Sequence, residues 1–311
     1  MTAAPDSSPK ARAATPAGGS TKAGRDHSVN VVLWRVLFLN LLVAVLKLVF
    51  GSLSGALSMV ADGFHSTLDA SSNVVGLIGL RIARRAPDED HPYGHRKFEA
   101  LAALGISLFL FITCYEILTS VVARFRGAHV VEPHPVTFAV MAGTIIVNLF
   151  VTRYERREGN RLRSMILLAD ARHTQSDVFA SLGVVASLVA AVLNVSAIDL
   201  VVAVAIAGFI AYSGYTIVSG AFTVLADSQM VDPDDVIRAA TGVEGVAHVH
   251  RVRSRGLPDD IHVDLHLHVS PQMTVERAHL LAHEASTRIR EEIPGVTDVV
   301  IHVEPHDEHE D

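Results

Sequence analysis

Two copies of one five-residue motif carry the clearest chemical signal in this sequence. The first is His65-Ser-Thr-Leu-Asp69 and the second is His173-Thr-Gln-Ser-Asp177. Residues four apart on a helix lie one turn from each other on the same face, so each copy would present an imidazole beside a carboxylate. Both copies lie in apolar sequence, where ionisable groups are costly and mark ion or proton pathways. If the two helices face each other, these four groups can bind one divalent metal ion.

The ligand types in these motifs favour zinc or a chemically similar metal. Zinc accepts imidazole nitrogen and carboxylate oxygen in tetrahedral sites, whereas calcium and magnesium prefer six or more oxygen ligands. On ligand type alone, cadmium, cobalt, nickel and iron(II) stay open beside zinc. Because binding needs neutral imidazoles and ionised carboxylates, it would release protons. This gives a physical route to metal–proton exchange.

Two further acidic residues precede the motifs by one turn. Asp62 lies three residues before His65. Asp170 stands in the same relation to His173, so each shares the face of its motif. They are expected to support the ligands or to line an entry path. The alternative for all of these groups is that they only hydrogen-bond neighbouring helices, but the duplication and the cost of charge in lipid favour a metal site.

The elements that must position these groups are membrane-spanning helices. Half of the residues are apolar, only 19% are charged and the mean hydropathy is positive, which is typical of a membrane protein with a soluble part. A spanning helix needs about 20 mostly apolar residues. Six stretches qualify and predict an α-helical membrane domain over residues 29–223, with helices over Val29–Phe50, Ala56–Ala83, Phe98–Phe125, Val136–Arg153, Met165–Leu193 and Ala197–Thr223.

The basic residues predict the orientation of this domain. An even number of spans places both chain ends on one side. Lys and Arg gather in the connections over 81–97 and 153–163 and are sparse in the others, which makes the first set cytoplasmic. The chain is therefore expected to be a multi-pass protein of a bacterial-type plasma membrane with both termini in the cytoplasm. Residues 1–28 lack the apolar core of a signal peptide and are expected to be a disordered tail.

The C-terminal quarter has a different composition. From Gln229 to Asp311 there are 17 acidic and 7 basic residues, a net charge of −10, and ten of the 17 histidines. Such a segment would suit cations and excludes a nucleic-acid partner. The patterning predicts a helix after Asp232, strands over 248–255 and 261–269, a helix over 274–292 and a strand over 296–303. This αββαβ order predicts an α+β domain over residues 224–306, followed by an acidic tail over 307–311.

Histidines recur on one face of the second predicted strand. His262, Asp264, His266 and His268 alternate there with Val and Leu, and period two places these four polar groups on one side of the sheet. A solvated polar face is the alternative to a metal site. Other groups that could join them come from the neighbouring elements: His250, His279, His283, His302 and Glu304.

A second group of ligand types lies in the connection after the second span. Its sequence begins Ala86-Pro-Asp-Glu-Asp-His-Pro-Tyr-Gly-His95, where Pro and Gly keep the start non-helical. The spacing of Asp88, His91 and His95 favours convergence on a metal ion, with a solvated loop as the alternative.

Taken together, these motifs resemble the cation diffusion facilitator family over about Val29 to Pro305. The two His-x-x-x-Asp motifs are similar to the family's transport site on spans two and five, and His at the first position is similar to its zinc and cadmium members. Asp88, His91 and His95 resemble the family's second zinc site. The resemblance implies a binuclear site in a metallochaperone-like cytoplasmic domain, with ligands at His250, His266, His279, His302 and Glu304.

The resemblance also implies how the protein works. It implies a homodimer in the lipid bilayer, in which a charge pair between Lys97 and Asp227 ties the two protomers near the membrane surface. This dimer would export cytosolic Zn²⁺ in exchange for protons by alternating access. Export of Fe²⁺, Co²⁺, Ni²⁺, Mn²⁺ or Cd²⁺ is the alternative within that class, and a membrane zinc sensor that moves no metal is an alternative outside it. The chain is not expected to be an enzyme, because no nucleophile or oxyanion motif accompanies the His and Asp residues.

Overall fold

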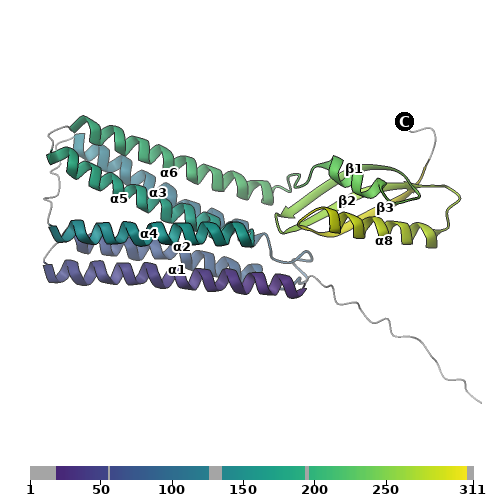
Figure 1. Cartoon of the computed structure of the whole chain (residues 1–311), viewed down its shortest axis with the longest axis horizontal. Coiled ribbons are helices and arrows are strands. Elements are labelled where there is room, and N and C mark those ends of the chain that lie inside the picture. The colour runs from purple at the N-terminus through teal and green to yellow at the C-terminus, as the bar shows by residue number, and fades with distance from the viewer. Residues whose placement is uncertain (1–18, 55–56, 126–134, 193–195, 307–311) are drawn as a thin grey trace, which may run out of the picture.

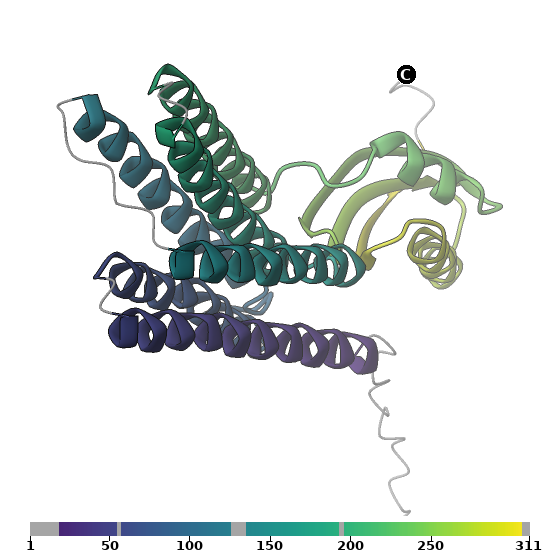
Figure 2. The same ribbon diagram turned by 60° about the vertical axis from the view of Figure 1, so that its left-hand side comes forward.

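Six long helices form a bundle beside a smaller α+β domain (Figure 1 and Figure 2). The structure is a computed structural model that describes residues 19–54, 57–125, 135–192 and 196–306. The bundle helices alternate in direction, so that the start of α1 and the end of α6 both lie next to the α+β domain (Figure 1). The six helices are α1 (Gly19–Ser54), α2 (Leu57–Ala83), α3 (Phe98–Phe125), α4 (Pro135–Leu162), α5 (Met165–Val192) and α6 (Ser196–Leu225).

Two of these helices are longer than the sequence predicts. Helix α1 begins at Gly19, ten residues before the predicted start, and so takes in part of the segment expected to be disordered. Helix α4 continues to Leu162, beyond the predicted end at Arg153. In both cases the extra turns are polar, because apolar length marks the part of a helix in lipid and not the part that extends into water. Residues 1–18 of the tail predicted over 1–28 lie outside the described residues, as does the acidic tail predicted over 307–311.

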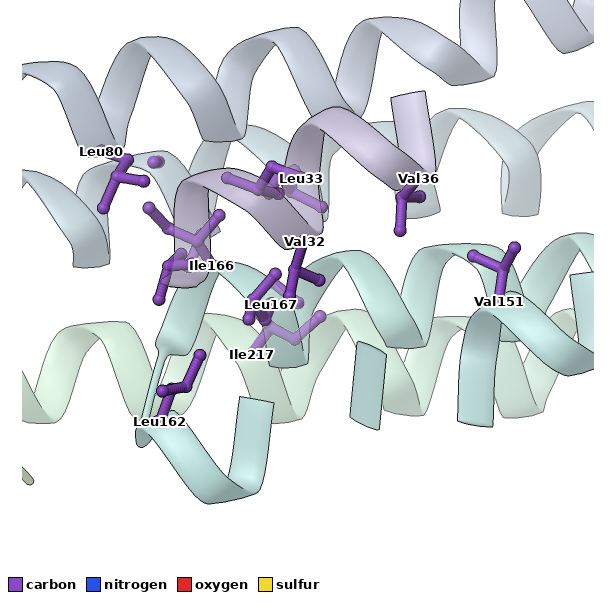
Figure 3. Packing of buried hydrophobic residues seen from close by; sticks show 14 of the residues in the cluster. Val32, Leu33, Val36, Leu80, Val151, Leu162, Ile166, Leu167 and Ile217 are labelled. Carbon is purple, nitrogen blue, oxygen red and sulfur yellow. The ribbon is translucent and has the colours of Figure 1, made fainter. Parts of the chain in front are cut away.

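The helices of the bundle differ in how apolar they are. Three described helical segments, Gly24–Leu53, Phe98–Ala123 and Val201–Leu225, are by themselves long and apolar enough to cross a membrane. Helices α2, α4 and α5 carry more polar residues, which include both His-x-x-x-Asp motifs. The buried core of the bundle joins both groups, with side chains such as Leu33, Leu80 and Ile166 in mutual contact near the domain-proximal end (Figure 3).

Close packing of α2 on α3 depends on one glycine. A Cβ atom on Gly79 would lie 2.2 Å from the Cβ of Ala102, well inside van der Waals contact. We therefore expect Gly79→Ala to destabilise the protein by about 1–3 kcal/mol through overpacking, measured as a lower melting temperature in detergent. The double variant Gly79→Ala/Ala102→Gly should recover most of this loss. Equal melting temperatures for the single variant and the wild type would contradict the packing described.

The α+β domain has the predicted element order. It contains α7 (Pro233–Thr241), β1 (Val246–Leu257), β2 (Asp260–Val269), α8 (Val275–Glu292) and β3 (Val296–Pro305). Strand β2 is central, antiparallel to β1 and parallel to β3. Both helices bury the apolar face of the sheet, where Val263, Leu265 and Leu267 are 1% exposed or less. The polar face predicted for β2 is therefore turned away from the helices.

Local signals explain the boundaries in this domain. The Asp232 carboxylate accepts a hydrogen bond from the backbone N–H of Asp234, and Pro233 occupies the first turn of α7. Thr274 caps α8 in the same way through Arg277. These are the preferred residues at helix starts. Gly256 has φ +117° at the β1–β2 turn, and a Cβ there would lie 2.2 Å from the backbone oxygen of Asp260.

Ion pairs join the two domains at the domain-proximal end of the bundle. Arg25 pairs with Asp26 and, through two nitrogens, with Glu99. Arg25 Nε and Arg96 Nη2 lie 2.9 and 2.6 Å from Asp259 Oδ2 in the β1–β2 turn. We refer to Arg25, Asp26, Arg96, Glu99 and Asp259 as the inner ionic cluster. It connects α1 and α3 to the sheet of the α+β domain.

Candidate metal sites

Three predicted ligands converge between α2 and α5. Asp69 of α2 and His173 and Asp177 of α5 each offer one ligand atom, and these atoms all lie within 4.8 Å of one another. The Nε2 atom of His173 lies 4.0 Å from Asp177 Oδ2, as expected for residues one turn apart. His173 is only 2% exposed, so the group is held inside the bundle. We call Asp69, His173 and Asp177 the bundle triad.

The bundle triad lines a small cavity of about 20 Å³. The cavity is also lined by Asn40 and Val43 of α1, Ser66 of α2, and Thr144 and Asn148 of α4. The amide and hydroxyl groups of these residues can orient carboxylates or complete a coordination shell. The sequence motifs did not predict the contributions of α1 and α4, because neither helix carries a recognisable ligand spacing.

The remaining motif residues divide into two cases. The side chains of His65 and Asp62 lie outside the described residues, although both positions belong to α2. Asp170 is fully buried and accepts hydrogen bonds from Ser72, at 2.8 Å, and from Asn73. It lies outside the groups of three ligand atoms found among the described residues, and its hydrogen bonds connect α5 to α2.

The predicted loop ligands also converge. Asp88, His91 and His95 each place a ligand atom within 4.8 Å of the others. Asp88 Oδ1 accepts a hydrogen bond from the backbone N–H of His91 at 2.7 Å, and Asp88 Oδ2 lies 3.3 Å from His95 Nε2. Gly94 adopts φ +83°, which lets the chain turn back before α3. We call these three residues the loop triad.

Hydrogen bonding within the loop triad favours the ionised form of Asp88. Burial acts to raise the pKa of Asp88, but the hydrogen bonds from the backbone and ring of His91 and the charge of His95 outweigh it, so the pKa is lowered. The carboxylate therefore stays ionised over a wider pH range. An ionised oxygen beside two imidazoles is a donor set that zinc accepts.

Four histidines surround Glu304 on the polar face of the sheet. Its two carboxylate oxygens lie 3.0 Å from His250 Nε2, 2.9 Å from His266 Nδ1 and 3.1 Å from His268 Nε2. His302 Nε2 lies 3.4 Å away. Two ligand groups share this carboxylate: His250, His268 and Glu304 form one, and His266, His302 and Glu304 form the other. The arrangement can bind two ions bridged by Glu304. We call these five residues the sheet cluster.

The sheet cluster changes the acidity of Glu304. Hydrogen bonds from His250, and then from His266 and His268, lower the pKa of Glu304 from 4.5 to about 2, although partial burial opposes the shift. The ionised carboxylate therefore stabilises the folded domain above about pH 4.5, and this contribution is lost as the pH falls towards 2.

We expect Glu304→Gln to lower the melting temperature of the chelator-treated protein near pH 6 and to have little effect near pH 2, because ionised Glu304 then no longer contributes. Circular dichroism of the full chain in detergent measures this. A control is Glu291→Gln, an exposed position on α8, which should change neither value. A difference between Glu304→Gln and wild type that stays constant down to pH 2 would contradict the assignment.

Three predicted histidines stand apart from the sheet cluster. His279 and His283 are exposed on α8, which packs on the apolar face of the sheet, so the sheet separates them from Glu304 within one chain. His262 lies 3.4 Å from Asp298 and 3.9 Å from Asp260 instead. The resemblance places His279 with the strand ligands, but spacing along the chain cannot show on which side of a sheet a helix packs.

Two further histidines, which the sequence motifs did not predict, lie at the edge of the sheet cluster. His306 Nδ1 lies 3.5 Å from His268 Nδ1, and the ring of His248 is 5.8 Å from that of His268. His248 is two residues from His250, and alternate residues of a strand lie on the same face. The spacing on β1 therefore predicts that His248 shares the polar face of the sheet. Lys97 Nζ lies 2.8 Å from Asp227 Oδ1 within one chain, whereas the resemblance implies that these residues tie two protomers together.

Comparison with known proteins gives the same division of the chain. Residues 33–226 match the cation efflux transmembrane domain, and residues 230–306 match the cation efflux protein cytoplasmic domain. The uncharacterized transporter MJ0449 of Methanocaldococcus jannaschii is 30% identical over 85% of this chain and 94% of its own length. The manganese efflux system protein MneS of Bacillus subtilis is 30% identical over 85% of this chain and 91% of its own.

Other similar proteins are more distant or shorter. Magnetosome protein MamB of Magnetospira sp. is 27% identical over 88% of this chain and 94% of its own length. The solved structure of MamM-CTD H285A covers 24% of this chain at 27% identity, with a TM-score of 0.23, an overlap too short to describe the whole chain.

The family matches span nearly all of residues 33–306, and the chain belongs to the cation diffusion facilitator family of membrane proteins, which move divalent metal cations out of the cytosol.

Proposed function

We propose that the chain exports zinc from the cytosol in exchange for protons. The observation that carries this proposal is the convergence of the bundle triad in a small polar cavity between helices of the membrane domain. His65 lies one turn from Asp69 on α2 and would supply the fourth ligand. Two imidazoles and two carboxylates form a donor set suited to tetrahedral zinc and poorly suited to calcium or magnesium.

Proton exchange follows from the same donor set. Metal binds to neutral imidazoles and ionised carboxylates, so loading the site releases protons and protonation releases metal. Alternating access to the cytosol and to the far side would then couple the two flows in opposite directions. Inverted vesicles that contain the protein are expected to lose an imposed pH gradient when zinc is added. Zinc uptake with no accompanying proton flux would exclude the antiport.

Manganese export is the second candidate, because MneS is a manganese efflux protein of similar sequence over most of both chains. Fe²⁺, Co²⁺, Ni²⁺ and Cd²⁺ fit the same site on ligand type. We expect His65→Asp to shift transport from zinc towards manganese, because manganese prefers oxygen ligands. Competition between the two metals in proteoliposomes measures the shift. A protein that binds zinc at the bundle triad but carries no ion would instead be a sensor.

We further propose a homodimer with regulatory metal sites in the cytoplasm. Each α+β domain and its tail carry a net charge of −10, so two such domains should repel each other until divalent cations bind. The sheet cluster and the loop triad would take up those ions. In the dimer, Lys97 and Asp227, which pair within one chain here, would pair across the two protomers near the membrane instead. Spin labels on paired domains should move apart on addition of chelator. An unchanged distance would count against metal-driven closure.

The loop triad is expected to bind metal without being required for transport. His95→Ala should remove about one zinc ion per chain in metal analysis, since His95 is the buried member of the triad. Zinc flux should continue, because the bundle triad is unchanged. The matched variant Asp69→Ala should also lose one ion but should lose flux with it. Loss of flux in both variants would place the loop triad on the transport path.

A further inference from the structure

A buried lysine contacts a residue that lines the cavity of the bundle triad. Lys47 of α1 is only 5% exposed, and α1 from Gly24 to Leu53 is one of the segments able to cross a membrane. A charged side chain at such a position is costly and marks a functional site. The Nζ atom of Lys47 donates a hydrogen bond to Ser66 Oγ at 2.8 Å. Ser66 in turn lines the cavity that holds the bundle triad.

Close contact between α1 and α2 fixes Lys47 at this place. A Cβ atom on Gly63 would lie 2.8 Å from Leu48 Cγ and 3.0 Å from the backbone nitrogen of Leu48. The two helices can therefore approach this closely only with glycine at position 63. Leu48 follows Lys47 and Gly63 lies one turn before Ser66, so the contact sets the register that brings the ammonium group to the Ser66 hydroxyl.

The position of Lys47 also places it on one side of the metal site. Asn40 of α1 lines the cavity, and Lys47 lies seven residues further on, two turns along the same face. Helix α1 starts at the domain-proximal end, so Lys47 is displaced from the bundle triad towards the opposite end. In the proposed orientation this is the side on which metal is released.

From this placement we infer that Lys47 is a positioning residue that weakens metal binding in the transport site and so promotes release. An empty site with ionised Asp69 and Asp177 carries two negative charges, which attract the ammonium. A bound divalent cation neutralises those charges and removes the attraction. The charge of Lys47 therefore stabilises the empty site relative to the filled one. The inference rests on the proposed transport site.

Transport by full-length protein in proteoliposomes tests the inference, with zinc as the probe, or manganese if the wild type carries only manganese. Lys47→Met keeps the length of the side chain and removes its charge, and it should lower KM about tenfold without raising kcat. Lys47→Arg keeps the charge and should return KM to within about twofold of wild type. Ser66→Ala should lower KM in the same direction by a smaller factor, because the ammonium loses its hydrogen bond.

Controls separate this inference from the proposed transport site. Leu46→Met changes a neighbouring, half-exposed residue of α1 and should leave KM and kcat unchanged. Should Lys47→Met fail to fold, Ser66→Ala and Lys47→Gln give the same comparison. An unchanged or raised KM in the charge-removing variants, or an equal drop in Lys47→Arg, would overturn the role of Lys47. Wild-type flux in Asp69→Ala would overturn the transport site itself.

Discussion

Replacing Asp69 by alanine is expected to abolish metal transport, with initial uptake rates in proteoliposomes lower by about a hundredfold or more. Asp69 is the contribution of α2 to the bundle triad, whereas His173 and Asp177 both come from α5. Without its carboxylate, the site loses a ligand and one of the charges that offset a divalent cation. Substitutions beside a metal site that leave its ligands in place already lower metal affinity or activity about 10- to 100-fold, so loss of a ligand should cost more.

The design of this experiment distinguishes the transport site from the other metal sites. Asp69→Ala should lose about one ion per chain in metal analysis, while the loop triad and the sheet cluster stay loaded. Glu291→Ala, at an exposed position on α8, removes a carboxylate from the same chain and should keep full flux. Full zinc transport by Asp69→Ala would refute the assignment of the bundle triad.

Replacing Glu99 by alanine is expected to cause the largest loss of stability, about 3–5 kcal/mol. The Glu99 side chain is completely buried and accepts hydrogen bonds from Arg25 at 2.7 and 3.1 Å and from Arg96 at 3.0 Å. Removing the carboxylate takes one anionic partner away from both Arg25 and Arg96, whose side chains are only 10–15% exposed. Burial of an uncompensated charge is what makes such a substitution costly.

Thermal and denaturant unfolding of the full chain in detergent would measure this loss. A matched control is Glu292→Ala, which breaks the exposed pair of Arg288 and Glu292 and should cost no more than about 1 kcal/mol. Because the inner ionic cluster joins α1 and α3 to the β1–β2 turn, Glu99→Ala should also loosen the contact between the domains. Equal stability of the two variants would show that Glu99 contributes no more than a surface pair.

The sequence predicts the α+β domain more closely than the bundle because its signals are local. Alternating polar and apolar residues identify β2, and Asp232 and Thr274 mark the starts of α7 and α8. In the bundle, hydropathy finds the six spans but not the helix ends, since the polar turns at Gly19–Ser28 and after Arg153 have no apolar signal.

The candidate sites show the same limit. Spacing of four residues predicts that His173 and Asp177 lie together, because both belong to one helix. It cannot predict that Asn40 of α1 lines the same cavity or that Lys47 of α1 contacts Ser66, since both depend on how close Gly63 lets the helices approach. Nor can it show that His279 lies across the sheet from Glu304. Spacing therefore predicts contacts within one element here. Contacts between elements, apart from the sites that the family resemblance implies, required the structure.

The size of the cavity at the bundle triad has a consequence for how an ion must travel. A volume of about 20 Å³ holds about one water molecule, so an ion that enters has to give up nearly all of its hydration shell. Magnesium parts with its water reluctantly and is disfavoured by the lack of space as well as by the ligands. A bound ion would fill this volume, so it would meet the protein ligands and not a second layer of water.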